Sequence, residues 1–91
     1  MNRGSSRWRR SEAALFREAL DDVVILVPGP DAEPFALAGG AALWRLLSQP
    51  RTTRELWSAL TEGMVITQAE AELDALLGQL ADSGAVEQIP A

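Results

Sequence analysis

The sequence predicts an α+β fold of winged-helix character, in which a three-stranded antiparallel sheet is followed by three helices. Three observations predict it. Extended apolar segments occur only in the first half of the chain, helical periodicity occupies the second half, and a Gly39-Gly40 pair lies between them. Because few residues remain for connections, the strands and helices are expected to pack as one compact domain.

The first two strands are expected over residues 13–20 and 22–27. The second of them is rich in Val and Ile, which favour the extended backbone because their side chains are branched at Cβ. Asp21-Asp22 would form the tight turn between the two strands. This pair is therefore interpreted as an antiparallel hairpin.

The third strand is expected over residues 33–38. It follows the Pro-Gly-Pro-Asp segment at residues 28–31, where two fixed φ angles flank a permissive glycine and close a second hairpin. Pro34 removes one hydrogen-bond donor from this strand, which a sheet tolerates at its edge. The third strand is therefore predicted to have a free edge.

The first two helices have clear boundaries. One is expected over residues 41–48, because leucines recur there at helical spacing and Pro50 enforces a stop. The second begins at Thr52, where the Thr-x-x-Glu spacing to Glu55 predicts a capping box. Gly63 is a natural left-handed terminator for it.

The third helix is expected over residues 67–82, with a second capping box between Thr67 and Glu70. Ser83-Gly84 would end it. Residues 85–89 either return as a short terminal strand or pack against the body. A narrow stripe on the helix is expected to face the core; it consists of Ala69, Leu73, Leu76, Leu77 and Leu80.

Composition excludes most chemistry. The 91 residues include no cysteine, histidine, tyrosine or lysine, which removes thiolates, imidazole bases, Schiff-base amines and the usual soft metal ligands. A chain this short also leaves little room for a deep active-site cavity. The protein is therefore predicted not to be an enzyme and to hold no cofactor and no metal. With no membrane span or signal peptide in its sequence, it is predicted to be cytoplasmic.

Charge divides the chain into two parts. Residues 1–10 carry four arginines and no acid, whereas residues 11–91 carry four arginines against all 13 acidic residues and so a net charge of −9. Residues 1–12 are predicted to form a flexible basic arm around Trp8, and residues 13–91 a single domain. An acidic body repels phosphate, so nucleic acid is not an expected partner.

A winged-helix transcriptional regulator is nevertheless the first alternative function, because many winged helices bind DNA. The candidate recognition helix at residues 67–82 argues against it, since it carries four acidic residues and no arginine. A small scaffold for an unrelated protein partner is the second alternative.

The order of motifs resembles the PqqD-like proteins, which recognise precursors of ribosomally made, post-translationally modified peptides. The likeness covers roughly residues 13–89. It rests on Phe35 and Leu37, on the Leu-Trp-Arg-Leu-Leu segment at 43–47, on Thr52 or Thr53 with Glu55-Leu56, and on the Ser-Gly-Ala-Val-Glu segment at 83–87.

The resemblance implies a non-catalytic, winged-helix-type peptide binder. In that family the leader of a precursor peptide adds as an antiparallel strand to the edge of the third strand, here residues 33–38, and lies in a groove against the third helix, here residues 67–83. The implied partners are the leader and a peptide-modifying enzyme, such as a radical SAM enzyme, a cyclase or a peptidase. A membrane is not an expected partner, and the chain is expected to be a monomer or an edge-strand homodimer.

Two features of the third helix bear on the groove. Ala71, Ala75 and Gly78 form a stripe of small side chains that would allow a close approach, although such residues are also ordinary on a helix surface. The acids Glu70, Glu72 and Asp74 either select a basic leader or simply complement the helix dipole. The predicted peptide-binding residues are Glu33, Pro34, Phe35, Ala36, Leu37, Ala38, Glu70, Ala71, Asp74, Ala75 and Gly78.

Overall fold

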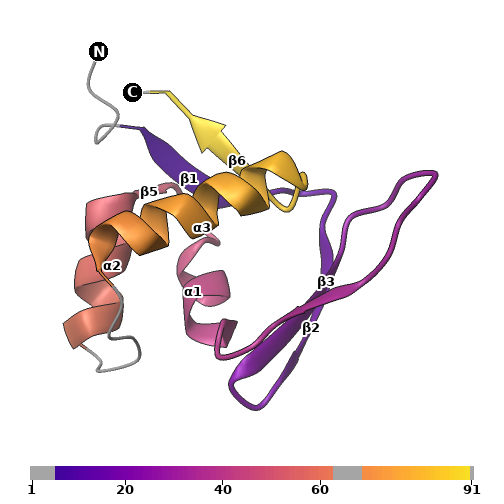
Figure 1. The fold of residues 1–91 in the computed structure, drawn as a ribbon, viewed down its shortest axis with the longest axis horizontal. Helices are drawn as coiled ribbons and strands as arrows, with labels where there is room; N and C mark the ends of the chain where they lie inside the picture. The colour runs from indigo at the N-terminus through magenta and orange to yellow at the C-terminus, as the bar shows by residue number, and fades with distance from the viewer. Residues whose placement is uncertain (1–5, 63–68, 91) are drawn as a thin grey trace.

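The computed structural model describes residues 6–62 and 69–90 and has the α+β architecture that the sequence predicts. The described residues form three helices and two three-stranded antiparallel sheets; in Figure 1 the helices lie at the left and centre, and the long hairpin of the second sheet extends at the right. The winged-helix character stays a prediction. In chain order the elements are β1 (Arg7–Arg10), β2 (Leu15–Ala19), β3 (Asp22–Leu26), β4 (Phe35–Leu37), α1 (Ala41–Leu46), β5 (Arg51–Thr52), α2 (Thr53–Glu62), α3 (Glu70–Asp82) and β6 (Val86–Ile89).

The first sheet has the strand order β5-β1-β6. It includes residues 7–10, which the sequence predicts to lie in a flexible arm over residues 1–12. Residues 7–10 form its central strand, pairing with β5 through Arg7↔Thr52 and with β6 through Trp8↔Gln88. Trp8 is only 6% exposed. Burial of the indole removes a large apolar area from water, and Arg9 pairs with Glu87 of β6 at 2.7 Å, so both residue types stabilise this strand. Residues 86–89 form a strand, which is one of the two outcomes that the sequence allows for this segment.

The second sheet has the order β2-β3-β4 and contains the predicted strands in shortened form. Its hairpin register pairs Ala19 with Asp22, so the turn falls on Leu20 and Asp21 rather than on Asp21 and Asp22. Leu20 takes the left-handed conformation there, with φ of 58°. The predicted turn is therefore wrong by one residue, because pairing of the two strands sets the register.

The predicted helices are present with adjusted ends. α1 ends at Leu46, two residues before its predicted end, in backbone that turns toward Pro50. At α2 the capping box is confirmed, since the Thr52 N–H donates to the Glu55 carboxylate at 2.8 Å and the Glu55 N–H donates to the Thr52 hydroxyl at 3.1 Å. α3 begins at Glu70, with Ala69 as its N-cap. The predicted terminator Gly63 and the Thr67 capping box lie outside the described residues.

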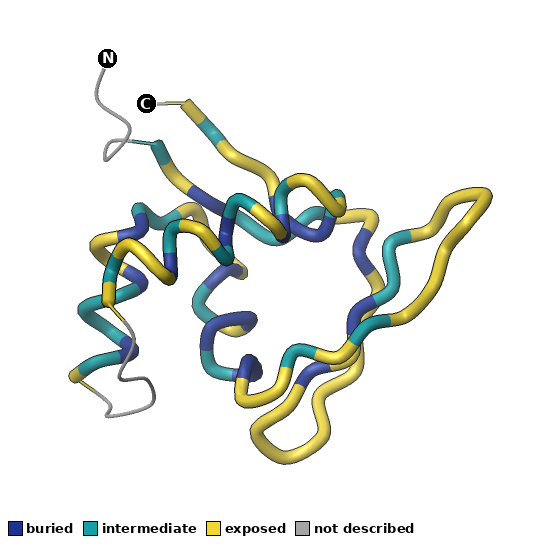
Figure 2. Tube along the Cα trace, in the orientation of Figure 1, coloured by how far each residue is buried: buried dark blue, intermediate teal, exposed yellow. Residues whose placement is uncertain are grey.

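The core lies where the helices meet both sheets, and the buried residues in Figure 2 follow this inner side. Trp44 of α1, with no exposed surface, is at its centre and packs edge-on against Phe16 at 5.5 Å between ring centroids. The guanidinium of Arg10 lies over the Phe16 ring at 4.7 Å, so an aromatic and cation–π stack joins β1 to β2. Val23 and Ile25 contribute the buried face of β3.

The Gly39-Gly40 pair makes the corner between β4 and α1, as its position in the sequence indicates. Gly39 has a φ of +68°, which favours glycine, and its N–H donates to the Asp22 carboxylate at 2.8 Å. Gly40 is needed for space, because a Cβ there would overlap the Leu37 side chain. Across residues 6–62 and 69–90, no helix has the length and apolar character needed to cross a membrane.

Candidate functional site

β4 provides the edge that the sequence predicts. It pairs with β3 on one side, from Val23↔Leu37 to Ile25↔Phe35, and among the described residues no strand pairs with its other side. Phe35 and Leu37 are half-buried and pack against the core, whereas Ala36 between them is exposed. The strand therefore turns two apolar side chains inward and leaves one flank of its backbone unpaired.

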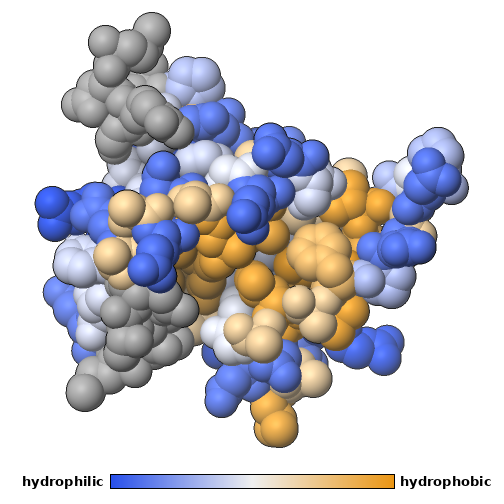
Figure 3. Space-filling model, viewed as in Figure 1, coloured by the Kyte–Doolittle hydropathy of each residue, from blue (hydrophilic) through white to orange (hydrophobic). Residues whose placement is uncertain are grey.

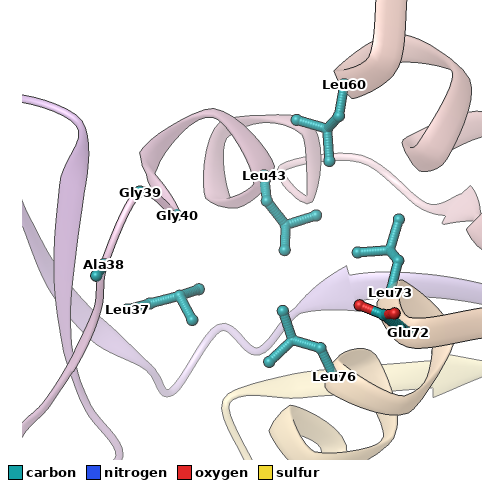
Figure 4. Close-up of a pocket in the computed structure, with 9 residues that line it drawn as sticks. All are labelled: Leu37, Ala38, Gly39, Gly40, Leu43, Leu60, Glu72, Leu73 and Leu76. Atoms are coloured by element: carbon teal, nitrogen blue, oxygen red, sulfur yellow. The ribbon is translucent and has the colours of Figure 1, made fainter. Parts of the chain in front are cut away.

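A hollow of about 240 Å³ opens at the carboxyl end of β4. Figure 4 shows leucine side chains from β4, α1, α2 and α3 pointing toward one another around it, with the Glu72 carboxylate beside them. We call it the first hollow. It is lined by Leu37, Ala38, Gly39, Gly40, Leu43, Leu60, Glu72, Leu73 and Leu76.

A second hollow of about 280 Å³ opens at the amino end of β4. It is continuous in its lining with the first, because Leu37 and Leu76 border both. We call the two together the β4–α3 groove, and Figure 3 shows an apolar surface in this region between the polar rims of the molecule. The second hollow is lined by Phe35, Leu37, Leu76, Gln79, Leu80 and Ser83.

Two local features hold the walls of the groove. Leu37 packs into the space that the missing Cβ of Gly40 leaves at the corner before α1, since a Cβ there would overlap its side chain. On the other wall, α3 is fixed to α2 by the Thr53 hydroxyl, which donates to the Asp74 carboxylate at 2.7 Å, and by an ion pair between Arg54 and Glu70 at 3.3 Å. The groove is therefore a preformed feature of the packed domain.

The predicted strand residues divide into two groups. Phe35, Leu37 and Ala38 line the groove. Glu33, Pro34 and Ala36 are exposed, and the first two precede the observed start of β4. A strand of three residues is shorter than the six predicted, because the chain leaves the ladder at the Pro34 position, where no N–H can be donated.

None of the five predicted residues of α3 is among those that line the two hollows. Glu70 and Asp74 face α2 through the contacts already described. Ala71 and Ala75 are exposed, and Gly78 has open space around the position of a missing Cβ. The stripe of small residues lies opposite the leucine stripe, as its spacing indicates.

The groove face of α3 consists instead of residues that the sequence assigned to the core or did not assign to the site. Leu73 and Leu80 are buried and Leu76 is half-buried, so the leucine stripe serves both the core and the groove wall. The sequence carries no separate signal for this second role, because the same helical spacing is expected of a stripe that only packs in the core. The lining residues not predicted as site residues are Gly39, Gly40, Leu43, Leu60, Glu72, Leu73, Leu76, Gln79, Leu80 and Ser83.

The chemistry of the groove is apolar. Glu72 is the one ionisable side chain among the residues that line it. Within the described parts of the chain, no group of three or more acidic residues is placed to hold a metal ion. The arrangement suits an extended chain that pairs with β4 and inserts apolar side chains toward α3.

The fold and the groove define a small α+β domain with an open sheet edge beside an apolar cleft. The family model of coenzyme PQQ synthesis protein D, PqqD, matches residues 38–86, which is more than half of the chain. The chain therefore belongs to the PqqD family, and it has a role in the biosynthesis of PQQ or a related ribosomally made product, in which it works with peptides and biosynthetic enzymes. Neither the curated proteins nor the solved structures include a match.

Proposed function

We propose that this chain is a non-catalytic recognition protein that binds the leader region of a ribosomally synthesised precursor peptide and presents it to a modifying enzyme. The leader adds as an antiparallel strand to the free edge of β4 and lies in the β4–α3 groove. One observation carries the proposal: β4 ends its sheet, and two apolar hollows open beside it. The strand edge supplies backbone hydrogen bonds, and the hollows receive side chains.

The free energy of leader binding is expected to come from both the hollows and the strand edge. Filling one hollow with an apolar side chain contributes roughly 1.5–3 kcal/mol. Ordering a flexible peptide offsets much of the gain from two such side chains. Backbone pairing with β4 is therefore needed as well, so both the strand edge and the hollows belong to the binding site.

A binding role fits the residue types better than catalysis does. The whole chain has no histidine, lysine, cysteine or tyrosine, and a groove with Glu72 as its ionisable side chain offers no base and nucleophile pair. The modifying enzyme, whether a radical SAM enzyme, a cyclase or a peptidase, supplies the chemistry. The recognition protein supplies proximity, which raises the effective concentration of the core peptide at that enzyme.

The backbone of the leader itself allows a sharp test. The proposal implies a precursor peptide encoded in the same genome, and its leader is the probe. It is prepared in two forms that carry N-methyl groups at alternate residues, in one form the odd and in the other the even positions. In an added strand only every second N–H points at the partner edge. One N-methylated form should therefore lose binding by isothermal titration calorimetry, while the other keeps most of it. Equal binding of both forms contradicts strand addition.

The hollows are tested by a matched pair of variants. Leu76 borders both hollows, and Leu76→Ala should weaken leader binding by roughly tenfold, the equivalent of about 1.4 kcal/mol. Leu15→Ala is the control, because Leu15 is 58% exposed on the alternate face of the second sheet. Equal effects of the two variants contradict the groove as the binding site.

A further inference from the structure

Glu72 stands apart from the other acids of α3. Glu70 is paired with Arg54, and Asp74 accepts a hydrogen bond from Thr53. Glu72 is exposed, it borders the first hollow, and within the described parts of the chain no arginine forms an ion pair with it. Its carboxylate is thus available to a ligand that occupies the groove (Figure 4).

The position of Glu72 along the groove determines which end of an added strand lies near its carboxylate. β4 runs from the second hollow, at Phe35, to the first hollow, at Leu37 and the glycine corner. A strand added antiparallel to β4 runs the opposite way, so its amino end lies at the first hollow and its carboxyl end at the second. Glu72 is therefore reached by residues near the amino end of the bound segment.

The two hollows also restrict the spacing of the ligand's apolar residues. Both open on the side of the sheet that faces α3, because Phe35 and Leu37 point that way and Ala36 does not. Side chains on a strand alternate between its two faces. Two apolar side chains of one added strand can fill both hollows only if they are an even number of residues apart.

We infer that Glu72 is a specificity-determining residue, which selects a leader segment with an arginine or lysine on the amino-terminal side of two apolar residues spaced by an even number. This inference rests on the proposed function, and it adds the charge, the order and the spacing of the ligand. The acidic body, at −9 over residues 11–91, favours the same sign of ligand charge at long range. Because Glu72 is exposed, its attraction for a ligand cation is modest and is screened by salt.

Four capped peptides of nine residues, each with the same fluorescent label, test the inference. The reference is TTRTLTLTT, with the arginine ahead of two leucines two positions apart. TTETLTLTT reverses the charge, TTLTLTRTT reverses the order, and TTRTLLTTT moves one leucine to an odd spacing. Fluorescence anisotropy at low salt should show the reference binding roughly three- to tenfold more tightly than the charge- and order-reversed peptides. The odd-spaced peptide should be weaker still, because one hollow stays empty.

Variants of the protein assign the selectivity to one side chain. Glu72→Gln should reduce the preference for the arginine peptide over the glutamate peptide to less than about twofold, the remainder coming from the acidic body, and Glu72→Arg should reverse it. Asp82→Asn is the matched control, since Asp82 is an exposed acid of the same helix that does not border the groove. It should leave the preference unchanged. The preference of the unmodified protein should also shrink in 0.5 M salt, because exposed charge pairs are screened there.

The outcomes separate this inference from the proposed function. If the arginine and glutamate peptides bind equally well, or if Glu72→Gln keeps the preference that Asp82→Asn also keeps, the role of Glu72 is overturned and peptide binding in the groove stands. If none of the four peptides binds and the encoded leader does not bind either, the proposed function is overturned together with the inference.

Discussion

The indole N–H of Trp8 donates to the hydroxyl of Thr53 at 2.9 Å, across 45 positions of the chain. The same hydroxyl donates to Asp74 at 2.7 Å, so one threonine joins β1, the first turn of α2 and the groove helix α3. Among residues 6–62 and 69–90, Thr53 is the one buried polar residue. This relay ties the amino-terminal strand to the wall of the groove.

Replacing Thr53 by valine should therefore destabilise the domain although the side-chain shape is kept. The indole N–H of Trp8 would lose its acceptor in a buried place, which costs about 1–3 kcal/mol. Chemical denaturation should detect this as a lower midpoint with an unchanged slope. Thr61→Val is the control, because the Thr61 hydroxyl donates only to backbone carbonyls within its own helix, at 2.8 Å to Trp57. A Thr53→Val midpoint equal to that of the control contradicts the relay.

Two glycine substitutions should have opposite effects. Gly40→Ala forces Leu37 away from the corner and should cost about 1–3 kcal/mol by overpacking, with weaker leader binding because Leu37 borders both hollows. Gly78→Ala has open space and lies inside a helix, so it should stabilise the fold by roughly 0.5–1 kcal/mol without changing leader binding. Thermal melts and leader titrations of both variants check this. A neutral Gly40→Ala would show that the corner does not hold Leu37.

The capping box of α2 should make stability depend on pH. Two interactions with Thr52 hold the pKa of Glu55 below its ordinary value of 4.5. The larger effect comes from the hydrogen bond with the Thr52 backbone N–H, and the next from the hydrogen bond with the Thr52 side chain. Because the folded pKa is the lower one, the contribution is present above about pH 4.5 and is lost as the pH falls through the folded value. Denaturation midpoints measured from pH 7 to pH 3 should fall less steeply in Glu55→Gln than in the unmodified protein. Parallel curves would exclude this contribution.

Random duplex DNA should not bind. The helix α3 carries Glu70, Glu72, Asp74 and Asp82 and no basic residue, and the body around it is acidic. A mobility-shift assay at low salt, where phosphate contacts are strongest, should show no retarded band at micromolar protein. A clear shift that disappears at 0.2 M salt would favour the transcriptional regulator instead.

Local patterns predict much of this fold but not its first strand. The hairpin of β2 and β3 and the helix at Thr52-x-x-Glu55 were readable because each is specified by neighbouring residues. β1 has one apolar residue, Trp8, in four, and its partners β5 and β6 lie more than 40 positions away. Pairing at that distance leaves no periodic signal in the strand itself, so an arginine-rich strand and an exposed arm have the same local pattern.

Of the two walls of the β4–α3 groove, only the β4 wall could be predicted from the sequence. Pro34 and the glycine corner indicate an edge strand, and β4 is one. On the other wall the sequence gives the apolar stripe of α3 but not the rotation of the helix about its axis, which decides whether Leu76 or Gly78 faces β4. Burial of Leu73, Leu77 and Leu80 against the core sets that rotation, and the contacts of α3 with α2 are consistent with it.

The most direct measurement of leader recognition is a titration of the isotopically labelled protein with the encoded leader peptide, followed through its backbone amide resonances. The largest changes should map to β4 and to the groove face of α3, at residues 35–38 and 72–83, and should be absent with a scrambled leader. Changes confined to the β5-β1-β6 sheet, or to the outer face around Leu15, would contradict the groove between β4 and α3 as the recognition site.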